Sequence, residues 1–254
     1  MLEVAEDGDP NGVPVLIHHG TPGAAGLYPA WVADARQRGL RLVSYSRPGY
    51  GCSTHRPGRT VADAVPDVQA VCDALGIDRF LSWGISGGGP HVLACAALLP
   101  ERVVAAASLA SPAPYGAEGL DFFEGMGEGN THDLKDFLEH GREAGRASFE
   151  QQAEGLRTAT VPDMVTAMSG FLTDVDAKEL TDSLGEFLLA NLQHALAPGV
   201  EGALDEDFIR PWGFDPADNW HPGAAAAGKT RRHGALRPRP VALTTHPSGR
   251  GAPV

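Results

Sequence analysis

Four short apolar runs recur along the first half of the chain, and each is followed by a loop rich in glycine, proline or serine. They are residues 14–19, 41–46, 79–85 and 102–110. Runs of this length that end in turn residues are typical of buried strands. Three segments of helical length lie between them, at Tyr28–Arg38, Val61–Leu75 and Gly89–Leu99. Strands that alternate with helices predict a doubly wound, mostly parallel α/β sheet.

The hydrophobic pattern changes on both sides of this region. Residues 2–12 hold a turn cluster and predict an antiparallel hairpin strand before the first parallel strand. From Ala113 onward, strand-like runs give way to helical periodicity, as at Leu184, Phe187 and Leu188. We therefore expect three parts, an N-terminal core at 1–112, a helical lid at 113–208 and a C-terminal remnant of the core at 209–254.

The last part of the chain has an unusual composition. Residues 219–254 contain no Asp or Glu, although the whole chain has 32 acidic residues, and they include many prolines and the run Ala224–Ala227. No strand or helix period is evident there, which predicts a basic, low-order tail from about residue 219. The last two strands of the sheet should then be absent or non-native, and the strand at 102–110 should be an uncovered, aggregation-prone edge.

Charge and composition narrow the classes of partner. The formal net charge is −12, which argues against nucleic acid and anionic membranes, since both need a basic surface. No apolar stretch approaches the roughly 20 residues of a membrane span, and the N-terminus lacks the features of a secretory signal. The chain has 3 cysteines, too few for a disulfide framework. These features favour a cytoplasmic protein that acts on a small molecule, and they fix no oligomeric state.

The strongest chemical signal is the segment SWGISGGGP at 82–90. Gly84, Ser86 and Gly88 form the pattern G-x-S-x-G between a predicted strand and a predicted helix, which is the context that a nucleophile elbow requires. The glycines leave room for a sharp turn, and the helix directs its positive end at the serine oxygen. A glycine-rich turn with an incidental serine is the alternative. A phosphate loop would need a lysine here, and a dinucleotide fingerprint would need glycine in place of Ser86.

A second signal, HHGTPG at 18–23, follows the first parallel strand. Acyl transfer needs two backbone N–H groups that face the developing oxyanion, and we expect Thr21 and Gly87 to supply them. Gly20 and His91 are expected to line the substrate pocket. His18 and His19 are expected to be hydrogen-bonded structural residues, because no cysteine or carboxylate with ligand spacing accompanies them. No metal or cofactor is expected.

Three motifs in order, HHGTPG, SRPGYGCS at 46–53 and GISGGGPH at 84–91, resemble the α/β-hydrolase superfamily in its lidded branch, which includes proline-iminopeptidase-like, haloperoxidase-like and esterase-like members. The resemblance covers residues 1 to about 217. It implies a mostly parallel eight-stranded sheet, with the lid between the sixth and seventh strands. It also implies a catalytic acid after the seventh strand and a catalytic histidine after the eighth. Ser46 stands where relatives commonly carry Asp.

The catalytic acid and base have no assigned residue in this sequence. No carboxylate follows Asp218, and His221, His233 and His246 follow no strand signal. A frameshift would explain this, because permitted codons for residues 223–243, read one nucleotide later, yield a strand, an acid loop and a helix in the family's order. The Asp codon would fall within Arg231. Sequencing the gene near codons 216–222 tests this hypothesis.

The sequence therefore predicts a serine hydrolase that acts on a small ester, amide or related acyl substrate through an acyl-Ser86 intermediate. An aminopeptidase is an alternative within the class, in which the acidic lid residues Glu118, Asp121 and Glu124 would receive a substrate ammonium group. The alternative from another class is a ligand-binding α/β-hydrolase-like protein without turnover.

Overall fold

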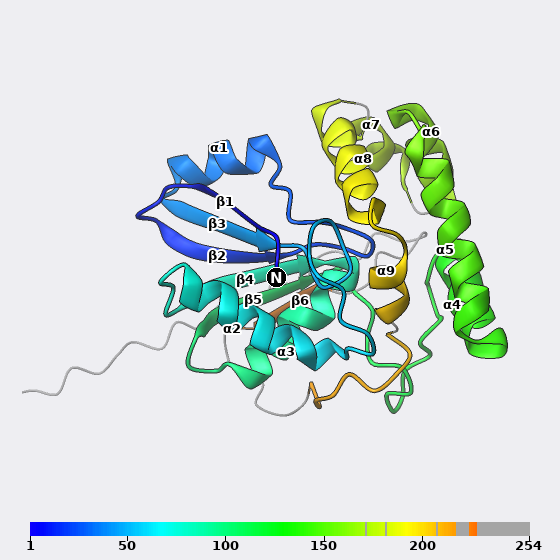
Figure 1. Ribbon diagram of the computed structural model, residues 1–254, viewed down its shortest axis with the longest axis horizontal. Coiled ribbons are helices and arrows are strands. Elements are labelled where there is room, and N and C mark those ends of the chain that lie inside the picture. The colour runs from blue at the N-terminus through cyan, green and yellow to red at the C-terminus, as the bar shows by residue number, and fades with distance from the viewer. Residues whose placement is uncertain (171, 181, 207, 217–223, 228–254) are drawn as a thin grey trace, which may run out of the picture.

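A six-stranded mixed sheet forms the centre of the molecule, with helices on both of its faces (Figure 1). The computed structural model describes residues 1–170, 172–180, 182–206, 208–216 and 224–227. Along the sheet the strands follow the order β1-β3-β2-β4-β5-β6. Their bounds are β1 Val4–Gly8, β2 Val13–His18, β3 Leu40–Tyr45, β4 Phe80–Ile85, β5 Val103–Leu109 and β6 Ala224–Ala227. The predicted doubly wound, mostly parallel sheet is confirmed, and the four parallel strands expected in the first half of the chain are β2 to β5.

The first strand does not form the expected hairpin. β1 pairs antiparallel with β3, with Val4 opposite Tyr45 and Gly8 opposite Arg41, whereas β2 lies on the other side of β3. The turn at residues 9–12 therefore connects two strands that are not neighbours, because β3 lies between β1 and β2. The prediction of an antiparallel strand is correct, and the predicted partner is wrong, because a turn signal does not reveal which neighbour a strand pairs with.

Three core helices cover the two faces of the sheet. α1, Pro29–Gln37, buries Val32 and Ala35 against Val15 and Ile17 on one face. On the opposite face lie α2, Ala64–Ala74, with the short 3-10 turn η1, Val61–Asp63, before it, and α3, Gly89–Leu98. These elements bury a larger cluster that includes Leu16, Val43, Val68, Phe80 and Val92. Alternating side chains of each strand thus enter two separate cores, as a doubly wound sheet requires.

The segment between β5 and β6 holds helices and no strand among its described residues. It contains α4 Glu128–His140, α5 Arg142–Arg157, α6 Val161–Ala167, η3 Met168–Gly170, α7 Asp174–Glu179, α8 Ser183–Leu196 and α9 Glu201–Asp205. In Figure 1 these helices stand together at one side of the sheet, with α8 and α9 between the sheet and α4 and α5. Leu196, Val200 and Leu204 pack with Ala153 in a core of their own. A role of this segment as a lid, and the domain boundaries, remain predictions.

The short strand β6 corrects the prediction for the tail. Ala224–Ala227 pair in parallel with Ala106–Leu109 of β5, so this part of the predicted low-order tail is a strand, and β5 is not an uncovered edge there. Four alanines show no alternation and favour helix on propensity alone. Backbone pairing to β5 outweighs that local preference. The rest of the tail prediction and the frameshift hypothesis concern residues 217–223 and 228–254, which lie outside the described residues.

The three cysteines form no disulfide, as their small number predicts. Cys72 and Cys95 are buried, Cys52 is exposed, and all three are free thiols. Burial raises the pKa of Cys72 to about 11, as expected for a cysteine that acts as a small apolar side chain. Within the described ranges, no helix has the length and apolar character that crossing a membrane would require.

Candidate active site

Ser86 lies at the corner where β4 ends and α3 begins. Its φ is +52°, one of two positive values among the non-glycine residues that the structure describes, and its side chain is exposed. Glycines make this corner possible, because a Cβ at Gly84 would lie 2.7 Å from the carbonyl oxygen of Gly88, and a Cβ at Gly88 would lie 2.2 Å from that of His18. A left-handed serine costs of order 1–3 kcal/mol, and such strain is typical of functional positions.

The loop after β2 faces the elbow. A Cβ on Gly20 would lie 3.6 Å from the Cβ of Ser86, and a Cβ on Gly87 would lie 2.1 Å from the Oγ1 of Thr21. The structure therefore places Gly20, Thr21 and Gly87 close together beside Ser86. The direction of the Thr21 and Gly87 amide groups toward an oxyanion remains a prediction.

A buried charge cluster that the sequence analysis missed holds this loop. Glu206, directly after α9, accepts hydrogen bonds from the Oγ1 of Thr21 and from Tyr50 Oη at 2.9 Å. It is paired with Arg47, whose Nη2 lies 2.8 Å from Oε2, and with Arg59, whose Nη2 lies 2.8 Å from Oε1. The side chains of Glu206 and Arg47 are 0% and 1% exposed. Arg47 also donates to the carbonyl oxygens of His19 and Gly20, so Glu206 fixes the loop through two routes.

The charges in this cluster determine its protonation. Burial alone would raise the pKa of Glu206, but the adjacent Arg47 and Arg59 hold that pKa well below its usual range. Glu206 is therefore an ionised carboxylate shared between two guanidinium groups. Pairing of this kind is what allows a charge to be buried.

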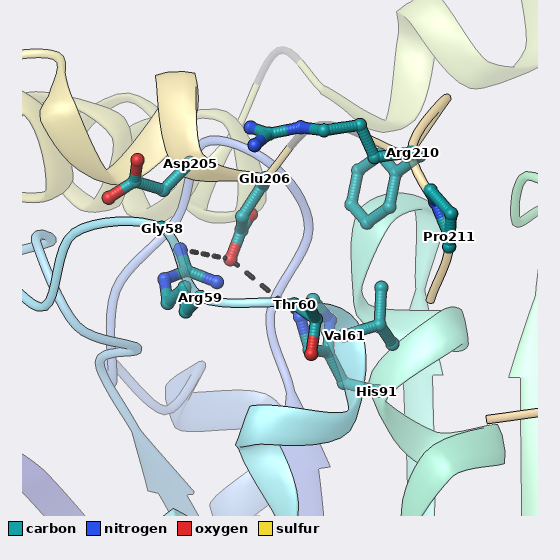
Figure 2. A pocket seen from close by; sticks show the side chains of 10 residues that line it. Gly58, Arg59, Thr60, Val61, His91, Asp205, Glu206, Arg210 and Pro211 are labelled. Atoms are coloured by element: carbon teal, nitrogen blue, oxygen red, sulfur yellow. Dashed lines mark hydrogen bonds and ion pairs between the residues drawn. The ribbon is translucent and has the colours of Figure 1, made fainter. Parts of the chain in front are cut away.

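A cavity of about 260 Å³ lies beside the cluster. Its lining includes Arg59, Val61, His91, Glu206 and Phe208, and Figure 2 shows the Glu206 carboxylate between Arg59 and His91. Phe208 lines this cavity and also lies against the elbow, because a Cβ on Gly87 would lie 3.0 Å from its Cζ. His91 thus lines a pocket next to the elbow, whereas Gly20 does not belong to the lining of this cavity.

Three buried histidines near the elbow are neutral. The Nδ1 of His19 donates to Gly20 O at 2.7 Å, and its Nε2 accepts from the Arg47 amide at 3.2 Å. Burial and then the charge of Arg47 lower the pKa of His18 to about 3, and lower those of His19 and His91 well below their usual values. The 3.9 Å approach of His91 Nε2 to Glu206 Oε1 is therefore no ion pair. His19 is hydrogen-bonded through both ring nitrogens, as expected. His18 differs, because its Nε2 makes one long contact with Cys95 Sγ at 3.9 Å and its buried Nδ1 has no partner among the described residues.

Among the residues that the structure describes, no histidine or carboxylate hydrogen-bonds to Ser86. His221, His233 and His246, to which the sequence assigns no catalytic role, lie outside the described residues, and so does Arg231. The acidic residues Asp121 and Glu124 line a different hollow, together with Phe123 and His132. That hollow and the cavity at His91 have no lining residue in common. Glu118 is exposed and lines neither hollow.

Ser46, which stands where relatives commonly carry Asp, is hydrogen-bonded to a carboxylate from another part of the chain. Its Oγ donates to Glu3 Oε2 at 2.6 Å and accepts from the Ala25 amide at 2.9 Å. A carboxylate from the N-terminal segment thus reaches the loop that an aspartate at position 46 would serve.

The neutral histidines predict a stability that declines in mild acid. An unfolded histidine takes up a proton near pH 6.5, whereas folded His18 does so only near pH 3, so each buried histidine disfavours the folded state as pH falls from about 6.5. The loss is about 1.4 kcal/mol per pH unit for each proton. The contribution of Glu206 is complete above its unfolded pKa of 4.5 and is lost below it. Urea unfolding at about pH 7.5, 6 and 5 should show this fall, and an unfolding free energy that is constant from about pH 7 to 5 would contradict it.

Comparisons with known proteins agree with this geometry. The family model of the alpha/beta hydrolase fold matches residues 13–166. The chain is 38% identical over 103 residues to a proline iminopeptidase of Neisseria meningitidis, which covers 39% of this chain and 32% of that protein. It is 33% identical over 111 residues to a bifunctional esterase/perhydrolase of Acinetobacter calcoaceticus, covering 43% of this chain and 40% of that protein. The matches thus span 32% and 40% of the length of these two relatives.

Solved structures show the same fold. A bromoperoxidase from Bacillus anthracis superposes with a TM-score of 0.54 and 21% identity, covering 81% of this chain and 68% of that one. A carboxylesterase of Nitrososphaera gargenis gives a TM-score of 0.53 and 17% identity, covering 82% and 67%. The family match includes β2 to β5, the loop at Thr21 and the elbow at Ser86, and it extends over more than half of the chain. The protein therefore belongs to the α/β hydrolase fold family.

Proposed function

We propose that the chain is a serine hydrolase in which Ser86 attacks a small ester, amide or related acyl substrate and carries the acyl group as a covalent intermediate. The observation that carries this proposal is the exposed Ser86 at φ +52°, between a strand and a helix, next to Gly87 and Thr21. A serine held this way is accessible to a carbonyl carbon, and the start of α3 directs the positive end of its dipole toward the serine oxygen.

The amide groups of Thr21 and Gly87 are proposed to bind the oxyanion. Two fixed N–H donors stabilise the charge that develops on the carbonyl oxygen, and this is commonly the largest single contribution to acyl transfer. The cluster of Glu206, Arg47 and Arg59 supports the arrangement, because its hydrogen bonds hold Thr21 and the carbonyl oxygen of Gly20 in place. The segment 113–208 is proposed as the lid, and its end contributes Glu206 and Phe208 to the cavity beside the elbow.

The cavity indicates a small substrate group. At about 260 Å³ it lies below the usual range for drug-sized ligands, which is roughly 300–1,000 Å³. Its lining combines the apolar Val61 and Phe208 with two arginines, Arg59 and Arg210, and two carboxylates, Asp205 and Glu206, and Arg59 is paired with Glu206. A short acyl chain fits this balance of apolar surface and neutralised charge.

Acylation by p-nitrophenyl acetate tests the proposal. Mass spectrometry of the intact protein should show one acetyl group per chain, located on the peptide that contains Ser86. We expect slow turnover, roughly 10³- to 10⁴-fold above the rate in water, because no base contacts Ser86 within the described residues. Absence of any acetylated protein, or acetylation at another residue, would contradict the proposal.

A ligand-binding protein without turnover is the second candidate. It is favoured by the lack of a described carboxylate or histidine at Ser86 and by the absence of Asp and Glu from residue 219 onward. An acetyl group that forms on Ser86 and is then released at a measurable rate favours the hydrolase. An unreactive Ser86 in a protein that still binds short acyl compounds favours the binding protein.

A further inference from the structure

Three side chains of different chemistry meet away from Ser86, where the N-terminal segment, the loop after β3 and helix α8 come together. The carboxylate of Glu3, the thiol of Cys52 and the imidazole of His194 each direct one ligand atom to this point, and these atoms lie within 4.8 Å of one another. The Nε2 of His194 lies 2.7 Å from Glu3 Oε1. Cys52 and His194 are exposed, so solvent ions reach the cluster directly.

The backbone around the cluster is already fixed in place. The Glu3 amide donates to Ser53 Oγ at 2.9 Å, and its carbonyl oxygen accepts from the Ser46 amide at 2.9 Å. The Gly51 amide donates to Ala195 O at 3.2 Å, which holds the residue before Cys52 against the residue after His194. A site whose ligands are positioned before the ion arrives loses less free energy to ordering on binding.

One oxygen of Glu3 serves this support while the other faces the cluster. Oε2 accepts from Ser46 Oγ at 2.6 Å and from the Cys52 amide at 3.0 Å, which leaves Oε1 toward His194. Hydrogen bonds of this kind to a ligating carboxylate are typical of the outer shell of metal sites. Gly51, with φ +51°, is required at this point, because a Cβ there would lie 2.2 Å from Glu3 Oε2 and 3.0 Å from His194 Nε2.

We propose that Glu3, Cys52 and His194 form a zinc site that clamps helix α8 to the core. A thiolate, an imidazole and a carboxylate are the ligand types that Zn²⁺ prefers, whereas Ca²⁺ and Mg²⁺ take oxygen ligands. Water completes a tetrahedral shell at the exposed side. On binding, the Cys52 thiol releases its proton to solvent, and the ligand atoms settle about 3.3–3.5 Å apart, as Zn–ligand bond lengths of about 2.0–2.3 Å require.

The rival explanation is a simple hydrogen bond between Glu3 and His194 that needs no metal and no cysteine. The two explanations differ in the role of Cys52. His140 supplies a matched control, since its Nδ1 lies 2.9 Å from Asp136 Oδ1 in an exposed histidine–carboxylate pair that belongs to no three-ligand group among the described residues.

Metal titration of the full chain tests the proposal. After treatment with a chelator, the protein should take up one Zn²⁺ in competition with a chromogenic chelator. Cys52→Ser and His194→Gln should each weaken binding about tenfold or more, and His140→Gln should leave it unchanged. Co²⁺ in place of Zn²⁺ should give a thiolate-to-metal absorption band that Cys52→Ser removes. Equal affinity in the wild type and Cys52→Ser, or a Co²⁺ spectrum without the thiolate band, would overturn the proposal. The test does not depend on the reactivity of Ser86.

Discussion

Replacing Glu206 with alanine should lower the free energy of unfolding by about 3–5 kcal/mol, because the change leaves two guanidinium groups without their shared counter-charge. Arg47 and Arg59 are 1% and 3% exposed in their side chains, so water does not replace the lost carboxylate. Tyr50 and Thr21 lose their acceptor as well. For a chain of this length we expect the melting temperature to fall by about 6–20 °C.

An exposed ion pair serves as the control for this variant. Glu154 pairs with Arg157 at 3.3 Å, but the two side chains are 74% and 73% exposed, so Glu154→Ala should leave the melting temperature nearly unchanged. Glu206→Gln keeps the shape and one acceptor oxygen but removes the charge and replaces the other oxygen with an NH2 donor, and it should fall between the wild type and Glu206→Ala. Equal melting temperatures for Glu206→Ala and Glu154→Ala would show that the cluster does not stabilise the fold.

Replacing Gly87 with alanine should slow acylation of Ser86 by about 10²- to 10³-fold, the loss that follows removal of one oxyanion donor. A Cβ at this position would lie 2.1 Å from Thr21 Oγ1 and 2.7 Å from Thr21 Cβ, so the two sides of the proposed oxyanion hole must separate. The rate of acetylation by p-nitrophenyl acetate, followed by the mass of the intact protein, measures the effect.

Gly155 provides the matched control for this substitution. It lies in α5, and a Cβ there would meet nothing within 4 Å, so Gly155→Ala should leave the acylation rate unchanged. Similar circular dichroism spectra for both variants would show that Gly87→Ala is folded. An acylation rate of Gly87→Ala equal to that of the wild type would contradict the proposed oxyanion hole.

The strands and helices of the first 112 residues could be predicted closely because their boundaries are chemically marked. The expected strand at 79–85 is observed at Phe80–Ile85, and the expected helix at Gly89–Leu99 is observed at Gly89–Leu98. The strand is followed by serine and glycine, and the helix is followed closely by proline. Such residues interrupt regular structure by their own backbone preferences. The turn at Ser86 could be predicted in the same way, because the glycines at 84 and 88 mark positions where a side chain would clash.

Pairing between distant segments could not be predicted in this way. β1 pairs with β3, and β6 is a run of alanines whose strand form depends on β5. Glu206 lies 159 residues from Arg47, and nothing near either residue in the sequence shows that both are buried. Arg47 and Arg59 are the sequence features that could have indicated the cluster, because a buried guanidinium requires a carboxylate partner. The sequence alone does not reveal which arginines are buried.

Labelling with a fluorophosphonate probe tests most directly whether Ser86 is a reactive nucleophile beside an oxyanion hole. We expect one probe per chain, attached to Ser86, slower attachment in Gly87→Ala, and none in Ser86→Ala at equal protein concentration. A folded wild-type chain that stays unlabelled, or whose label persists in Ser86→Ala, would contradict it.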